Sequence, residues 1–292
     1  MVKGIFPPIT TPFINEELAL DKLAENISKW NKTDLSGYVV LGSNGESAFL
    51  TREEKLTLIE NVKKNATKDK LVIAGTGSDS IKETISLTND AAAKGADYAL
   101  ILTPSFFKEK LDSNSFIKYF NEVADKIDIP LIIYNVPKYT GVNIEASPVA
   151  KLSEHPNIIG LKNSSENIAH LAEIIYNSKD DFITLVGTAS VLLPGLCAGA
   201  AGGILALANI APNECIKIIN LFNDRKIIEA SKLQGKIIPV NKAITGKYGV
   251  AGLKAAMDML GYFGGDPRSP LNKMSKNELE DMKNILIKAD LL

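Results

Sequence analysis

The sequence predicts an α/β protein, a closed (β/α)₈ TIM barrel followed by a C-terminal helical extension. Eight short apolar runs recur at fairly even spacing, amphipathic segments lie between them, and the strand signal is lost after about residue 210. Most of the runs are continuously apolar, which is typical of parallel strands covered on both faces. Eight similar units without an edge-type strand favour closure over the alternative, an open doubly wound sheet.

The eight expected strands are rich in β-branched residues and end near Gly, Ser, Thr, Asn or Pro. They cover residues 4–10, 37–43, 71–77, 98–104, 131–137, 158–164, 184–189 and 202–207.

Helix-start signals lie between these strands. Thr51 and Glu54 form a capping-box pattern ahead of a helix over residues 56–64, and Asp112 or Ser113 precedes one over residues 116–127. Four further helices are expected near the C-terminus, over residues 214–222, 227–239, 253–260 and 276–289. No low-complexity linker separates them, so we expect a barrel over residues 1–225 and an extension over residues 226–292, packed on the barrel or on a neighbouring subunit.

The composition argues against several classes of protein, including nucleic-acid-binding, zinc-binding, disulfide-rich and membrane proteins. The net charge of −1, from 33 basic and 34 acidic residues, provides no field for nucleic acid or an anionic membrane. The two cysteines, Cys197 and Cys215, are too few for a four-ligand zinc site or a disulfide framework. No apolar run approaches membrane-spanning length, and the N-terminus lacks a secretory apolar region. We therefore expect a soluble, cytoplasmic protein.

Lys162 lies inside the sixth apolar run, where a lysine is unusual. An ammonium group rarely enters such a strand unless it is paired or used chemically. Burial favours the neutral amine, which is the nucleophile that forms a Schiff base with a carbonyl substrate. Tyr134 ends the neighbouring fifth strand, so its phenol would face the same barrel mouth. The alternatives are that Lys162 extends out to a surface carboxylate and that Tyr134 is a packed aromatic residue.

The second strand ends in residues 42–46, Gly-Ser-Asn-Gly-Glu. Two glycines flank a hydroxyl and an amide, which leaves backbone N–H groups free to approach a carboxylate. The alternative is a tight turn without a binding role. His155, in a loop, and His170, on a helix, are expected to be surface or packing residues rather than catalytic bases.

Together these motifs resemble the dihydrodipicolinate synthase / N-acetylneuraminate lyase family of class I, pyruvate-handling aldolases. The resemblance extends over essentially the whole chain and depends on residues 42–46, 134–137 with Thr140 and Gly141, 160–162, and 202–204 with Asn209.

The resemblance implies a role for each matching residue. Lys162 would form the imine with pyruvate or another 2-oxo acid, and Tyr134 would relay protons. Ser43 and Asn44 would hold the substrate carboxylate, and the backbone carbonyl of Ile204 would line the site. The family needs no metal and no cofactor beyond this covalent imine, and its members usually assemble as homotetramers, dimers of dimers.

Three departures narrow the choice within the family. Tyr139 occupies the position where the synthases carry an arginine that grips the carboxylate of the aldehyde, and Lys138 is one residue away. Phe106 replaces a tyrosine that crosses into the neighbouring subunit, so its hydroxyl must be lost or borrowed from Ser105, Tyr139 or water. Asn44 replaces a second threonine and is similar to the 4-hydroxy-2-oxoglutarate aldolases.

The expected function is therefore reversible cleavage of a 4-hydroxy-2-oxo acid, either 4-hydroxy-2-oxoglutarate or a 2-keto-3-deoxy sugar acid, to pyruvate and an aldehyde. The first alternative is a 4-hydroxy-tetrahydrodipicolinate synthase, which condenses pyruvate with aspartate semialdehyde. A non-catalytic relative is the second alternative. A phosphate-binding barrel, with anion sites near Gly187 or Gly202, would leave Lys162 unexplained.

Overall fold

The computed structural model describes residues 2–292 and contains an eight-stranded parallel barrel. Its strands are β1 (Gly4–Phe6), β4 (Gly37–Val40), β5 (Leu71–Gly75), β6 (Tyr98–Leu102), β7 (Leu131–Asn135), β8 (Ile158–Asn163), β9 (Ile183–Val186) and β10 (Gly202–Ile204). They pair in the order β1-β10-β9-β8-β7-β6-β5-β4, and a parallel bridge between Pro8 and Val39 joins the two ends of the sheet. The predicted fold class is confirmed, and each of the eight expected runs overlaps a strand.

The strands are shorter than the predicted runs because their polar ends already belong to loops and turns. Residues 43–45, for example, form the 3₁₀ turn η1 (Ser43–Gly45) directly after β4. The apolar pattern also did not predict the antiparallel hairpin of β2 (Phe13–Ile14) and β3 (Glu17–Leu18), whose strands have two residues each.

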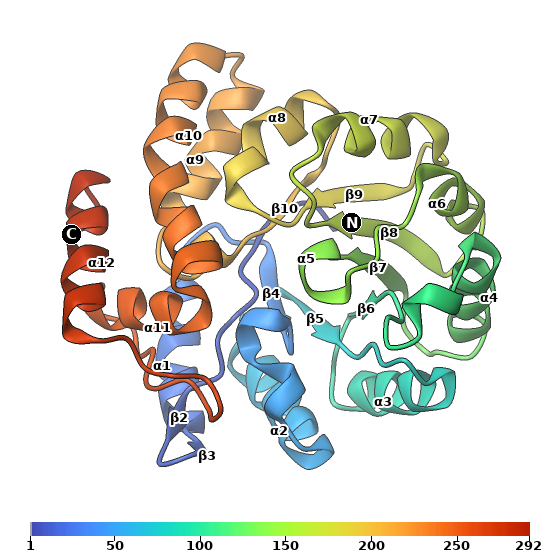
Figure 1. Cartoon of the computed structure of the whole chain (residues 1–292), viewed down its shortest axis with the longest axis horizontal. Helices are drawn as coiled ribbons and strands as arrows, with labels where there is room; N and C mark the ends of the chain where they lie inside the picture. Colours follow the sequence, from blue (N-terminus) through green and yellow to red (C-terminus); the bar gives the residue numbers. More distant parts are fainter. Residues whose placement is uncertain (1) are drawn as a thin grey trace.

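Helices surround the barrel in the order of the chain, except the short α5, which lies over the open end of the barrel (Figure 1). They are α1 (Leu20–Trp30), α2 (Arg52–Asn65), α3 (Ile81–Ala93), α4 (Ser113–Ala124), α5 (Pro137–Thr140), α6 (Ala146–Ser153), α7 (Ile168–Asn177) and α8 (Leu192–Cys197). The capping box predicted at Thr51 is present, since its side chain accepts from the Glu54 N–H and its own N–H donates to the Glu54 carboxylate. Asp112 caps α4 in the same way.

Four helices follow the barrel and gather on one side of it (Figure 1). They are α9 (Pro212–Asn223), α10 (Ile227–Lys242), α11 (Gly249–Met259) and α12 (Lys276–Lys288). A single apolar cluster includes Val240 and Met257 of these helices together with Ile9 and Leu207 of the barrel, all of them buried. The C-terminal helices and the barrel therefore share one core.

An unpredicted π-helical turn, Ala243–Lys247, joins α10 to α11. It lies against the open end of the barrel and contributes to the cavity described below. No helix among residues 2–292 is long and apolar enough to cross a membrane.

The barrel interior is filled by buried apolar side chains from every strand except β8, whose partly buried Ile159 packs against them. Phe6, Val39, Ile73, Leu100, Ile132, Tyr134, Leu185 and Ile204 form one buried cluster there. This cluster fills the barrel beneath the carboxyl ends of the strands. Enzymes of this fold carry their active sites at those carboxyl ends.

Candidate active site

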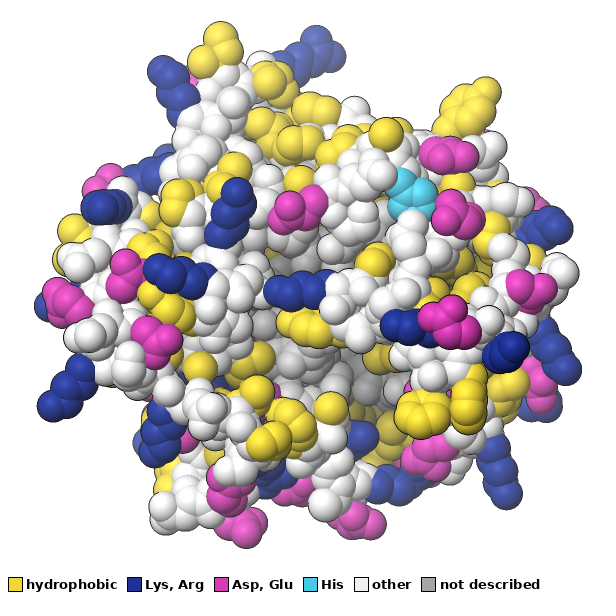
Figure 2. All heavy atoms as spheres, in the orientation of Figure 1, with side chains coloured by type: hydrophobic (Ala, Val, Ile, Leu, Met, Phe, Trp, Pro, Cys, Tyr) yellow, Lys and Arg dark blue, Asp and Glu magenta, His cyan; other side chains and the backbone are white. Residues whose placement is uncertain are grey.

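A cavity of about 770 Å³ opens at the carboxyl ends of the strands. It is lined by residues that end or follow β4, β7, β8, β9 and β10, and by the π-helical turn. Figure 2 shows the hollow near the middle of this face, with basic and apolar side chains around it. A cavity of this size accommodates a small organic acid with space for a second reactant.

Lys162 and Tyr134 lie side by side at the bottom of this cavity. They are directly paired in the register of β8 and β7, so their side chains project from the same face of the sheet. The Lys162 Nζ atom lies 4.0 Å from the centre of the Tyr134 ring. Only 3% of Lys162 and 5% of Tyr134 are exposed. The amine therefore faces the ring inside the cavity and does not extend to a surface carboxylate.

The Tyr134 hydroxyl is held in a polar setting within this buried site. Its oxygen lies 3.4 Å from the Ser43 Oγ atom. Burial raises the pKa of a phenol, but the positive charge of Lys162 and hydrogen bonds from Ser43, Lys162 and Ser164 outweigh it, so the pKa of Tyr134 is below its ordinary value of 10.0. A phenol with a lowered pKa exchanges its proton more readily, which suits an acid–base group.

Ser43 and Asn44 both line the cavity from the turn η1. The N–H groups of Gly45 and Glu46 bond within the turn, to the carbonyls of Gly42 and Ser43. The N–H groups of Ser43 and Asn44 lie at the start of the turn, where a backbone N–H has no acceptor within the turn itself. A Cβ atom at Gly45 would lie 3.0 Å from the Ile9 carbonyl oxygen, so a larger residue would crowd the turn against this backbone. The segment is thus both a tight turn and part of the cavity wall.

Ile204 ends β10 and is fully buried in the interior cluster that contains Tyr134. The residue after this strand that lines the cavity is Ala206. The proposed contact of the Ile204 carbonyl with a substrate stays a prediction.

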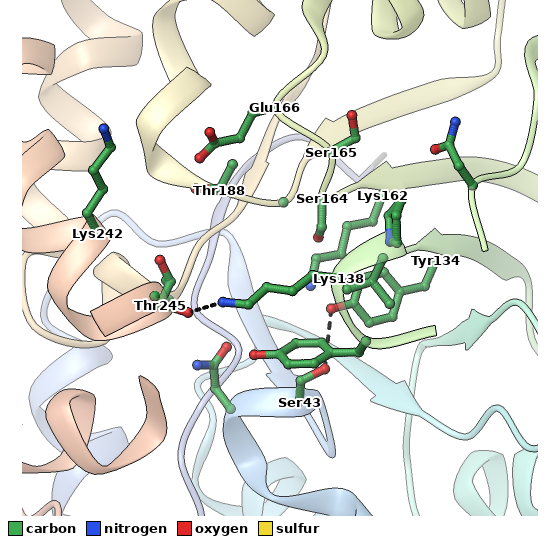
Figure 3. Close-up of a pocket in the computed structure, with 18 of the residues that line it drawn as sticks. Ser43, Tyr134, Lys138, Lys162, Ser164, Ser165, Glu166, Thr188, Lys242 and Thr245 are labelled. Carbon is green, nitrogen blue, oxygen red and sulfur yellow. Dashed lines mark hydrogen bonds between the residues drawn. The ribbon is translucent and has the colours of Figure 1, made fainter. Parts of the chain in front are cut away.

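The cavity rim carries basic residues, of which the sequence had pointed only to Lys138. Lys138, Lys242 and Lys247 all line the cavity. Lys138 extends across its middle, and its Nζ atom donates to the Thr245 carbonyl at 2.6 Å (Figure 3). Lys242 and Lys247 come from the extension, far from any strand end, so no local pattern identified them.

Further polar residues follow β8 and β9. Ser164, Ser165, Glu166 and Thr188 line the same cavity, and they continue strands that the sequence had located (Figure 3). The residues after a strand end could have been included on that ground.

Other residues that the sequence singled out lie elsewhere. Phe106 is 78% exposed and is not part of the cavity lining, whereas Tyr139 lines it. His155 contacts Asp125, and His170 is buried on α7; neither lines the cavity. Within residues 2–292, no three His, Cys, Asp or Glu side chains gather in a group able to hold a metal ion.

None of the three arginines lines the cavity either. Arg52 bonds to Asp90, and Arg268 bonds to Glu54. A guanidinium fork for a substrate carboxylate is therefore not provided by the cavity wall of this chain.

Comparison with known proteins identifies the family of this chain. The dihydrodipicolinate synthetase family matches residues 1–289. The chain belongs to this family. The predicted resemblance is confirmed, and so is the enzyme class it implies, because enzymes of the dihydrodipicolinate synthetase family are carbon–carbon lyases.

Individual members of the dihydrodipicolinate synthetase family match over nearly their full length. A 4-hydroxy-tetrahydrodipicolinate synthase of Methanothrix thermoacetophila is 37% identical over 290 residues, which are 99% of this chain and 97% of the relative. A probable mitochondrial 4-hydroxy-2-oxoglutarate aldolase of Emericella nidulans is 34% identical over 294 residues, 97% of this chain and 93% of the relative. The crystal structure of dihydrodipicolinate synthase from Aquifex aeolicus superposes with a TM-score of 0.94 at 31% identity, covering 99% of each chain. The named relatives therefore differ in the reaction they are said to catalyse.

Proposed function

We propose that this protein is a Schiff-base aldolase that reversibly cleaves a 4-hydroxy-2-oxo acid to pyruvate and an aldehyde. The observation that supports this most is the buried Lys162 amine, 4.0 Å from the centre of the Tyr134 ring at the bottom of an open cavity. An amine placed there is shielded from water yet reachable by a small keto acid.

The proposed reaction begins at Lys162. Its neutral amine attacks the C2 carbonyl of the substrate, and the Tyr134 phenol protonates the hydroxyl that leaves as water. The resulting iminium accepts the electron pair of the C3–C4 bond as that bond breaks, while the Tyr134 phenolate takes the proton of the 4-hydroxyl. The aldehyde departs, and the phenol returns its proton to C3 of the enamine. Water then hydrolyses the imine and releases pyruvate.

Orientation of the 2-oxo acid is assigned to the turn η1. We infer that Ser43 and Asn44 bind the carboxylate of the substrate through the hydroxyl and the opening N–H groups of the turn, with the Ile204 carbonyl on the opposite side. Holding the carboxylate fixes C2 against Lys162, and such positioning contributes a large part of the rate enhancement in enzymes.

Lys138 is the group that we assign to the second carboxylate of an acidic substrate. Its ammonium already lies in the middle of the cavity, where it donates to the Thr245 carbonyl. A carboxylate on the aldehyde portion would take that hydrogen bond over, because an ionic partner forms a stronger bond than a neutral carbonyl. Lysine acts as a single point charge rather than a planar fork. This supports 4-hydroxy-2-oxoglutarate, whose cleavage gives glyoxylate, ahead of a sugar acid.

A second candidate is the condensation of pyruvate with aspartate semialdehyde. It is favoured by the Methanothrix relative, a 4-hydroxy-tetrahydrodipicolinate synthase that is more similar to this chain than the Emericella aldolase is. Against it stands Tyr139, where the synthases were expected to carry arginine. The lysine imine would serve either reaction without another cofactor. Homotetramer assembly, which the resemblance implies, and a cytoplasmic location, which the composition suggested, are further proposals.

One pair of measurements tests these proposals. Borohydride reduction in the presence of pyruvate should add a stable mass to the peptide that contains Lys162. A panel of 2-oxo acids should then show faster pyruvate release from 4-hydroxy-2-oxoglutarate than consumption of aspartate semialdehyde. Faster consumption of the semialdehyde would favour the synthase, and absence of any adduct would favour a non-catalytic relative.

A further inference from the structure

Glu46 is a buried carboxylate that the proposed reaction does not use. It follows directly after the turn η1, which carries Ser43 and Asn44, and only 3% of it is exposed. Its backbone has a φ of 56°, the left-handed conformation that residues with a Cβ atom rarely adopt. A carboxylate in such a place requires partners that compensate both its burial and its backbone conformation.

Both carboxylate oxygens of Glu46 have partners in the C-terminal extension. The Nζ atom of Lys254, on α11, lies 2.5 Å from Oε1, and the backbone N–H of Arg268 donates to Oε2 at 2.8 Å. Lys254 is completely buried, and its Nζ atom also donates to the Asp266 carbonyl at 2.9 Å. The ion pair thus joins the end of η1 to two parts of the extension.

Close packing around Lys254 leaves little space for this contact to shift. Its ammonium lies 4.6 Å from the centre of the Phe13 ring. A Cβ atom at Gly264 would lie 2.0 Å from the Lys254 carbonyl oxygen, so the loop that holds Asp266 and Arg268 packs directly against the helix backbone.

The turn is also fixed from the barrel side. The Thr11 hydroxyl, on the segment that follows β1, donates to the Gly45 carbonyl at 2.6 Å, and both residues are buried. The turn is therefore held on one side by the barrel through Thr11 and on the other by the extension through Glu46.

We propose that Glu46 and Lys254 are positioning residues, which hold the turn η1 so that Ser43 and Asn44 meet the substrate carboxylate while Lys162 reaches its keto carbon. This inference rests on the proposed binding role of that turn. It assigns to the extension a function in substrate binding through the barrel loop it holds.

The test compares Glu46→Gln, Lys254→Met and the double variant with the parent enzyme. The half-saturating concentration of pyruvate and the limiting rate of borohydride trapping are measured for each, together with the Tm. Loss of a hydrogen bond to a charged carboxylate weakens binding by about ten- to a hundredfold. We therefore expect each single variant to raise half-saturation by about ten- to a hundredfold, with a limiting rate within about threefold of the parent.

The double variant distinguishes the effect of losing the ion pair from the effect of leaving one buried charge without its partner. A single substitution leaves the other charge buried without its partner, whereas the double variant removes both. The amide that Glu46→Gln introduces can still accept from the Arg268 N–H. We expect the double variant to recover Tm and to bring half-saturation back toward the parent value. It also keeps the proposal testable if Lys254→Met does not fold.

Asp97→Asn is the matched control. It removes the charge from an ion pair of 2.8 Å with Lys63, while its amide oxygen can still accept from the Val72 N–H, at the start of β5 and β6, the end of the barrel away from the cavity. This variant should lower Tm while half-saturation stays within about twofold. Equal half-saturation in Glu46→Gln and the parent, or an equal rise in the control, would overturn the proposal.

A measurement without substrate distinguishes this inference from the proposed function. Ultraviolet titration, with the signal of Tyr134 assigned by subtracting that of a Tyr134→Phe variant, reports the contact between Tyr134 and Ser43. Displacement of the turn should shift that titration in Glu46→Gln and leave it unchanged in Asp97→Asn. If the parent forms no adduct with pyruvate, the proposed function fails, and the titration alone decides whether Glu46 positions the turn. A titration that does not shift in Glu46→Gln rejects that positioning role.

Discussion

Replacing Tyr134 with Phe removes one hydroxyl from the site and leaves the aromatic ring. The ring that lies 4.0 Å from the Lys162 Nζ atom is retained, so the amine keeps this contact. The bonds that are lost are those of the hydroxyl with Ser43, at 3.4 Å, and with Lys162 and Ser164. A typical hydrogen bond contributes about 0.5–1.5 kcal/mol to stability, so the free energy of unfolding should fall by about 1–2 kcal/mol.

Turnover should fall far more than stability in this variant. A positioned acid–base group contributes about 10²- to 10⁴-fold to the rate, which corresponds to about 2.7–5.4 kcal/mol of barrier. The proposed reaction starts with a protonated phenol, so activity of the parent should decline as pH rises through the pKa of Tyr134, which lies below 10.0. That decline should be absent from the residual activity of the variant.

The assay is pyruvate release from 4-hydroxy-2-oxoglutarate, followed across pH, with borohydride trapping of the Lys162 adduct in parallel. Tyr119→Phe is a matched control, because its buried hydroxyl, on α4, donates at 2.6 Å to the Ser78 carbonyl in the loop before α3, and neither residue lines the cavity. The control should lose stability and keep its turnover. A loss below tenfold in Tyr134→Phe, with an unchanged pH profile, would make Tyr134 a packing residue.

Three further predictions address separate contacts. Lys162→Ala should abolish the borohydride adduct and turnover while circular dichroism shows an intact fold; retained turnover would contradict the imine. Lys138→Met should raise KM for 4-hydroxy-2-oxoglutarate by about tenfold, since it loses one charged hydrogen bond, and leave half-saturation by pyruvate unchanged. Glu54→Gln should lower the free energy of unfolding at pH 7 by about 1–3 kcal/mol through loss of its ionic bonds with Arg268. Those bonds hold the pKa of Glu54 below its ordinary value of 4.5, so denaturant titration should show the difference from the parent shrinking as pH falls through that lowered pKa.

The strands and the central pair of site residues could be predicted from the sequence because their signals are local. A continuous apolar run indicates a buried parallel strand, and a lysine inside such a run is an anomaly that chemistry explains. The order of the strands then places Lys162 beside Tyr134, since consecutive βα units of a barrel are neighbours.

The contributions of the extension could not be predicted in this way. Lys247 lies in a π-helical turn with no distinctive composition, and Glu46 meets Lys254 only through the packing of α11 on the barrel. Glu46 was noted as part of a turn motif, but nothing near it in the sequence identifies a buried cation as its partner. Pairing between distant segments depends on the tertiary fold, which local patterns do not encode.

The choice of substrate depends on the rim of the cavity rather than on its bottom. Lys162 and Tyr134 would form and use the same imine in either proposed reaction, so their presence cannot separate an aldolase from a synthase. What differs is the group that meets the second reactant. Here Lys138 offers one ammonium, held by the Thr245 carbonyl, where the synthases were expected to offer a guanidinium from the position of Tyr139. Glyoxylate and aspartate semialdehyde both carry a carboxylate, so selectivity between the two reactions would depend on whether that carboxylate meets a single ammonium or a planar guanidinium fork.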